Sequence, residues 1–155
     1  MPQLAKGGKH VFGWSKVGAA GHIRIPPEAA DEYGLLGDLA VILVSASRTS
    51  GGFVLMRPNL VEVSPLAAVL REHPILSDAG SEGTLTVWNK RLYTRVALHR
   101  GSFDLPAIEG TGFTYDLHVG DLLLVVRGSY VGPSFLSRGP LIAEADRHGE
   151  LEVFE

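Results

Sequence analysis

Two stretches of the chain carry basic residues and no acidic ones. Residues 1 to 27 contain Lys6, Lys9, Lys16 and Arg24, and residues 83 to 103 contain Lys90, Arg91, Arg95 and Arg100. These windows hold eight of the fourteen Lys and Arg residues of a 155-residue chain whose net charge is -3. Clustered Lys and Arg side chains bind phosphate, so the windows indicate contact with the backbone of a nucleic acid.

Residue patterns typical of enzymes are missing. The chain has no cysteine, which excludes disulfides, thiol nucleophiles and cysteine-based zinc sites, and its six histidines are not spaced as ligand pairs. Gly110-Thr111-Gly112 is too short for a dinucleotide fingerprint, and Gly128 and Gly132 have the wrong spacing for a nucleophile elbow. We therefore expect no catalytic residues, no metal and no cofactor.

A second group of polar and aromatic residues allows two interpretations. Arg127, Tyr130, Phe135 and Arg138 lie close together in the sequence. They could line a pocket for an anionic ligand, or the arginines could guard an exposed edge strand while Phe135 packs inward. Charged edge strands are common, which favours the second interpretation.

The elements that must position these residues come in two copies of one pattern. GHIRIPPEAADEYGLLGDLAVILV begins at Gly21, and GSFDLPAIEGTGFTYDLHVGDLLLVV begins at Gly101. In each copy a polar-apolar alternation typical of a half-buried strand follows another strand-like stretch, residues 11–17 or 92–98. Each copy is therefore expected to open with a β-hairpin.

The hairpin of the first copy leads into a short helix. Pro26 ends the strand, Pro27 suits the first helical position, and the helix is expected to run to Tyr33 and stop at Gly34. The second copy has Gly110 and Gly112 in the corresponding segment, so a looser connection is expected there.

A Gly-Asp pair precedes the most apolar run of each copy, Gly37-Asp38 in the first and Gly120-Asp121 in the second. Glycine can take positive φ in a tight turn and aspartate can accept backbone N–H groups there, so both pairs are interpreted as structural turns. The two aspartates could instead form a carboxylate pair for acid–base chemistry, but neither has a base nearby in the sequence.

We expect one domain over residues 1–155. It comprises a first repeat at 9–57, a linker at 58–85 with a short helix between Ser64 and Pro74, and a diverged second repeat at 86–155. A short helix over 141–148 and a strand over 151–154 are expected at the end of the chain.

This order of elements resembles the AbrB/SpoVT/MazE family of swapped-hairpin DNA-binding proteins. The resemblance covers about residues 11–56 and, more faintly, 92–137. It implies a mainly β fold, a small β-barrel of two interleaved repeats with short helices, here joined in one chain as a pseudo-dimer. The Gly-Asp turn is shared by double-psi and riboflavin-kinase-like cradle-loop barrels, which are the alternative.

The resemblance implies a transcriptional regulator that contacts double-stranded DNA through basic β-hairpins. The candidate contacts are Lys9, Lys16, His22, Arg24, Lys90, Arg91, Arg95 and Arg100. The alternative is a ligand- or protein-binding barrel without DNA binding, which the acidic helix residues 28–32 favour. A homo-oligomer is compatible with either. No stretch approaches the about 18 apolar residues of a membrane span or resembles a signal peptide, so a cytoplasmic location and no membrane partner are expected.

Overall fold

The computed structural model describes residues 10–61, 67–78, 82–108, 112–129, 131–147 and 151–155. Its fold is mainly β, as expected. The strands are β1 (Val11–Lys16), β2 (His22–Arg24), β3 (Leu39–Ser45), β4 (Phe53–Met56), β5 (Leu85–Trp88), β6 (Arg91–Leu98), β7 (Ser102–Asp104), β8 (Ala107–Ile108), β9 (Gly112–Phe113), β10 (Leu122–Ser129), β11 (Gly132–Leu136) and β12 (Val153–Phe154). The α-helices are α1 (Pro27–Tyr33), α2 (Pro58–Val61), α3 (Ala67–Glu72) and α4 (Pro140–Ala145), and the 3-10 turns are η1 (Ala19–Gly21), η2 (Pro74–Ser77) and η3 (Thr114–Asp116).

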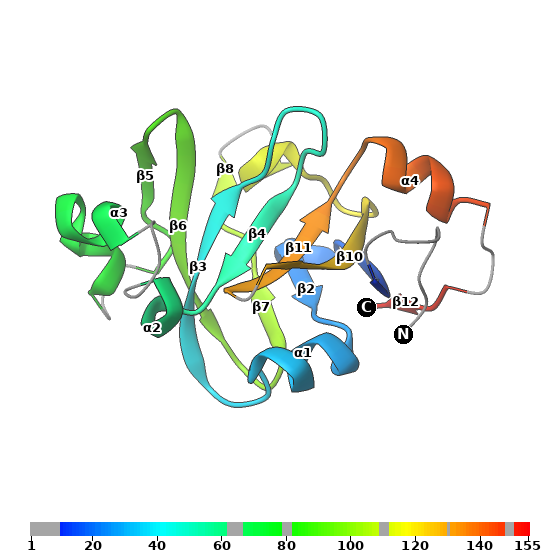
Figure 1. The fold of residues 1–155 in the computed structure, drawn as a ribbon, viewed down its shortest axis with the longest axis horizontal. Coiled ribbons are helices and arrows are strands. Elements are labelled where there is room, and N and C mark those ends of the chain that lie inside the picture. Colours follow the sequence, from blue (N-terminus) through cyan, green and yellow to red (C-terminus); the bar gives the residue numbers. More distant parts are fainter. Residues whose placement is uncertain (1–9, 62–66, 79–81, 109–111, 130, 148–150) are drawn as a thin grey trace.

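Strands from the two halves of the chain are interleaved in one sheet, mostly as pairs from the same half. Its order is β12-β1-β10-β11-β4-β3-β6-β5, and β2 and β7 form a separate two-stranded ribbon (Figure 1). Four antiparallel pairs join the halves: β1 with β10, β3 with β6, β4 with β11, and β2 with β7. Each half therefore completes part of its sheet with strands of the other half.

The two apolar runs are strands that are buried on both faces. In β3, Val41 and Leu43 pack into the main core while Ile42 packs into a second cluster on the opposite face. In β10, Leu123 packs into the main core and Leu124 into a third cluster. Double-sided burial explains why these strands have continuous apolar sequences instead of an alternating pattern.

Short helices supply the outer cover of the sheet. Val69 of α3 packs against the outer face of β3, and Ala145 of α4 packs against that of β10. The two helices lie at opposite ends of the molecule, with α1 beneath the sheet (Figure 1). The main core between sheet, ribbon and α1 contains a stacked pair of rings, Phe53 and Phe135, with centroids 4.8 Å apart.

Most expected elements are present, some with different bounds. α1 spans the expected residues, begins with Pro27 and ends at Gly34, whose φ of 69° is left-handed. The linker helix covers Ala67–Glu72 within the described residues, and its expected start lies outside them. Between β7 and β10 of the second copy, the described residues 105–108 and 112–121 contain no α-helix, as the glycines suggested. Helix α4 and strand β12 are shorter than expected.

Candidate nucleic-acid interface and a cationic cleft

The β2–β7 ribbon presents two candidate contacts to solvent. His22 and Arg24 are exposed on β2, while Ile23 between them is buried, as the alternation predicted. His22 lies opposite Asp104 in the ladder, and its Nδ1 is 2.9 Å from the Asp104 carboxylate. The ribbon therefore positions both side chains, and it gives His22 an acidic neighbour.

The remaining candidates near the ribbon are Lys16 and Arg100. The hydroxyl of Ser15 donates to the Arg24 carbonyl over 2.7 Å, which holds the end of β1 beside β2. Arg100 occupies the β6–β7 turn, where the Gly101 carbonyl accepts the amide of Ile25 over 2.8 Å. Lys16, His22, Arg24 and Arg100 thus gather around one ribbon, and we call them the ribbon face.

The end of the chain approaches this face. Lys16 Nζ lies 3.4 Å from a Glu155 carboxylate oxygen. The Arg24 guanidinium lies over the Phe154 ring, 5.7 Å from its centroid. Both contacts are at the surface, where an ion pair contributes about 0–1 kcal/mol and is screened by salt.

Lys90 and Arg91 lie away from the ribbon face. Lys90 belongs to the tight turn between β5 and β6, in which Asn89 and Lys90 have φ of 50° and 64°, and Arg91 follows that turn. Arg91 begins β6 and Arg100 follows the other end of that strand. At about 3.3 Å per residue, the two arginines are separated by roughly 25 Å along the strand direction. The second basic window is therefore divided between two places, and Lys9 lies outside the described residues.

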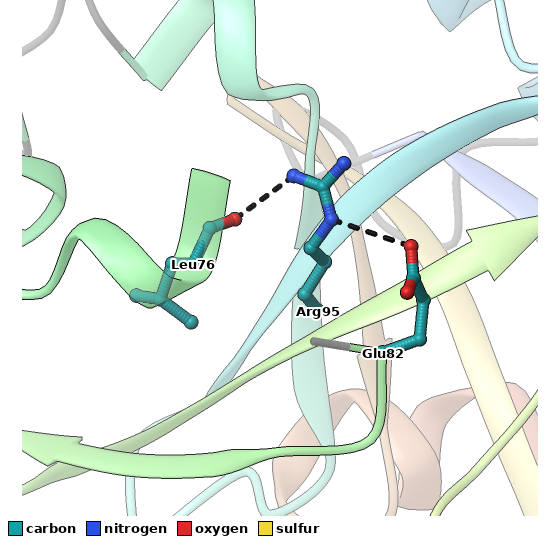
Figure 2. A network of polar contacts seen from close by, with 3 residues as sticks. All are labelled: Leu76, Glu82 and Arg95. Atoms are coloured by element: carbon teal, nitrogen blue, oxygen red, sulfur yellow. Dashed lines mark hydrogen bonds and ion pairs between the residues drawn. The ribbon is translucent and has the colours of Figure 1, made fainter. Parts of the chain in front are cut away.

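Arg95 is embedded in the fold. Its side chain is 12% exposed, and Nη1 donates to the Leu76 carbonyl over 3.0 Å. Its Nε lies 3.5 Å from the Glu82 carboxylate (Figure 2). These contacts attach turn η2 to β6. We assign Arg95 to this structural contact and leave it out of the interface proposed below.

The two Gly-Asp turns differ from each other. Gly120 has φ of 95°, and the Asp121 carboxylate accepts the backbone N–H of His118 over 2.9 Å, as predicted for such a turn. The φ of Gly37 lies outside the left-handed region. The prediction that this turn needs the positive φ of glycine is therefore wrong for Gly37. Asp38 instead lies 2.7 Å from His99 Nδ1, a contact between the two halves of the chain.

A cleft of about 360 Å³ opens on the side of the β5–β6 turn. Four loop segments meet there: the β3–β4 loop, the β5–β6 turn, η3 and the residues after β11. They contribute the basic side chains Arg48, Lys90, Arg91 and Arg138, together with one carboxylate, Asp116. We call this site the cationic cleft. Arg48, the adjacent pair Lys90 and Arg91, and Arg138 are far apart in the sequence, so no single run of residues indicates this site.

The structure does not bring Arg127, Phe135 and Arg138 together in one pocket. Arg138 lines the cationic cleft, whereas Phe135 is fully buried. Arg127 makes two hydrogen bonds to the Glu32 carboxylate, and these bonds lower the pKa of Glu32. Tyr130 lies outside the described residues. The anion-pocket interpretation therefore fits one of the two arginines.

One residue that lines the cleft, Tyr115, is a largely buried tyrosine. Desolvation strongly raises the pKa of Tyr115, with a smaller contribution from Tyr93. The Tyr115 ring packs against Phe53, with centroids 5.4 Å apart, and its hydroxyl donates to the Leu92 carbonyl. Tyr115 is therefore a neutral wall of the cleft.

Within the described ranges, no three histidine or carboxylate side chains gather as a metal site would require. No helix in that part of the chain is both long and apolar enough to cross a bilayer. Comparisons of the chain with protein-family models, curated proteins and solved structures gave no match.

Proposed function

We propose that the protein is a non-enzymatic, cytoplasmic DNA-binding regulator, built as a pseudo-dimer barrel of two swapped-hairpin repeats. The proposed repeats pair their equivalent strands reciprocally: β1 of the first with β10 of the second, and β6 of the second with β3 of the first. The remaining equivalent strands pair with each other, β2 with β7 and β4 with β11. Such reciprocal pairing is what a swapped-hairpin duplication requires, and it supports this fold over a simple meander.

The observation that carries the functional proposal is the ribbon face. Lys16, Arg24 and Arg100 come from three segments that meet at the β2–β7 ribbon, whose outer side carries exposed residues while Ile23 and Phe103 face the core. A two-stranded ribbon has the dimensions to enter the major groove, and cations at its base can contact the phosphates on either side. Phosphate contacts of this kind supply affinity and fix the orientation of a protein on DNA.

A specific observation favours the second candidate, a ligand- or protein-binding barrel without DNA binding. Carboxylates of Asp104 and Glu155 lie beside His22 and Lys16 and offset part of the positive charge. DNA must displace or tolerate these acids. The two candidates therefore predict opposite results in a DNA-binding measurement.

The test is binding of random-sequence duplex DNA over a series of salt concentrations, with fluorescence anisotropy as the readout. The Arg24→Gln/Arg100→Gln double variant removes two cations of the ribbon face. Each lost phosphate contact is expected to reduce the slope of log affinity against log salt by about 0.9. Two lost contacts thus reduce it by roughly 1.8.

The matched control is Arg71→Gln/Arg147→Gln, which removes the same charge from exposed positions on α3 and just after α4. It is expected to retain the parent slope. If the parent does not bind at low salt, or if both double variants behave alike, the regulator proposal is abandoned for the second candidate.

A further inference from the structure

The cationic cleft has the charge and shape of an anion site, and it is separate from the ribbon face. Four basic side chains line it against the single carboxylate of Asp116. Among the residues that the structure describes, Arg48, Lys90 and Arg91 have no ion pair with a carboxylate. No ion pair therefore offsets the positive charge of these three side chains, and an anion in the cleft would do so.

Backbone hydrogen bonds hold one wall of the cleft in place. The Ser50 carbonyl accepts the amides of Ser137 and Arg138 over 3.0 and 2.9 Å. The Arg138 Nε donates to the Arg48 carbonyl over 2.8 Å. This bond orients the Arg138 side chain. Because a guanidinium has five N–H donors, the N–H groups of its two terminal nitrogens can still donate to a ligand. The β3–β4 loop and the segment after β11 are thus joined before any ligand arrives.

Glycine is required at the centre of this wall. Gly52 has φ of 68°, and a Cβ there would lie 1.9 Å from the Phe135 carbonyl oxygen. No other residue type fits this approach without moving the backbone.

Unusual backbone conformations also concentrate in the cleft. Among the described residues, six other than glycine have positive φ: Ala20, Asn89, Lys90, Arg100, Tyr115 and Asp116. Four of these six line the cleft, two in the β5–β6 turn and two in η3. Each such residue costs on the order of 1 kcal/mol or more, and strain of this kind clusters at ligand sites.

The lining specifies the chemistry of the ligand. Its volume falls in the range of roughly 300–1,000 Å³ found for small-molecule sites. The Tyr115 ring packs against Phe53, and the other lining residues are polar or small, so recognition must come from charge and hydrogen bonds. Arginine forks match phosphate oxygens, and the Asp116 carboxylate can accept hydroxyl groups.

We propose that the cationic cleft binds a small phosphate monoester that also carries hydroxyl groups, such as a sugar phosphate. The phosphate lies among Arg48, Arg138 and the β5–β6 turn, and Asp116 accepts a ligand hydroxyl. This site does not depend on DNA binding by the ribbon face, since the two use different residues. A phosphate in the cleft can also belong to a DNA backbone, and the experiment separates these sources.

The probe is ribose 5-phosphate, titrated into the full-length protein by calorimetry at low salt. Loss of a charge-assisted hydrogen bond weakens binding by about tenfold or more. Arg48→Gln/Arg138→Gln is therefore expected to reduce ribose 5-phosphate affinity at least about tenfold, while Arg71→Gln/Arg147→Gln retains it. Asp116→Asn is expected to weaken ribose 5-phosphate more than inorganic phosphate, because only the sugar has hydroxyls for the carboxylate.

Duplex DNA provides the second arm. Arg48→Gln/Arg138→Gln is expected to bind DNA as the parent does. The proposal is overturned if ribose 5-phosphate does not bind at millimolar concentration, or if the cleft double variant binds it as the parent does. It is also overturned if that variant loses DNA binding while the parent binds ribose 5-phosphate no better than inorganic phosphate, because the cleft then holds a phosphate of the DNA backbone. If this variant melts below the parent, Lys90→Gln/Arg91→Gln replaces it, because both residues are exposed beside a turn.

Discussion

Replacing Gly132 by alanine tests how closely the two halves of the chain are joined. Gly132 begins β11, which pairs with β4 of the first half. A Cβ at this position would lie 1.6 Å from the Leu55 carbonyl oxygen, whereas real Cβ atoms essentially never approach closer than 3.0 Å. The obstacle is backbone, so one of the two strands must move.

The cost has two parts. Overpacking in a well-packed region costs about 1–3 kcal/mol. Moving the strands also endangers the bond from the Arg57 amide to the Val131 carbonyl, which is worth about 1 kcal/mol. A total of roughly 2–4 kcal/mol corresponds to a Tm lowered by roughly 5–15 °C in a chain of this size.

Differential scanning calorimetry measures this change, and Gly37→Ala is the matched control. Gly37 has open space around its Cβ position and a φ outside the left-handed region. Alanine there is expected to leave Tm unchanged or raise it slightly, since it restricts the unfolded chain. If Gly132→Ala melts within about 2 °C of Gly37→Ala, the close contact between β11 and β4 does not exist as described.

Three further predictions concern stability. Asp121→Ala should lower the free energy of unfolding by about 1 kcal/mol, because the hydrogen bond from the His118 amide is lost. Asp38→Ala should lower it by less, because the pair of Asp38 with His99 is exposed. Urea unfolding compares the two variants, and equal losses would contradict the difference between the turns. Burial raises the pKa of Tyr115 above its value in the unfolded chain, so the stability that this residue contributes is complete below about pH 10 and is lost as pH rises further. In urea unfolding between about pH 8 and 11, the free energy of unfolding of Tyr115→Phe should therefore decline less than that of the parent. Equal declines would be inconsistent with this cause. A fragment of residues 1–60 should aggregate or self-associate in analytical ultracentrifugation, because β1 and β3 lose their partners β10 and β6, and a cooperatively folding monomer would count against it.

Local elements could be predicted from the sequence because their signals are local. Pro27 and Gly34 define the ends of α1, and the alternation of residues 22–25 identifies β2 and the burial of Ile23. The strand over residues 85–88 was not predicted. Its apolar residues Leu85 and Val87 are exposed, so the segment has neither the buried apolar residues of a core strand nor the polar composition of a loop.

The candidate site was harder to predict because it depends on tertiary contacts. The acid-free window that began at residue 83 excluded Glu82 by one position, and Glu82 is the carboxylate that lies beside Arg95. The cationic cleft joins Arg48, Arg91 and Arg138, which no pattern of spacing connects. Only the antiparallel pairing of β3 with β6, and of β4 with β11, brings their loops to the same side.

The reciprocal pairing of the strands also determines when the chain can fold during synthesis. Val11 pairs with Val126, and Leu39 pairs with Leu98, so the first half must wait for most of the second. At about 5–20 residues per second, that delay lasts several seconds on the ribosome. Long-range pairing is also intrinsically slow, so β1 and β3 stay without partners for longer than strands of a simple hairpin. Neighbouring nascent chains on one messenger RNA carry the same strands, and exchange of halves between them is the competing outcome that this topology creates.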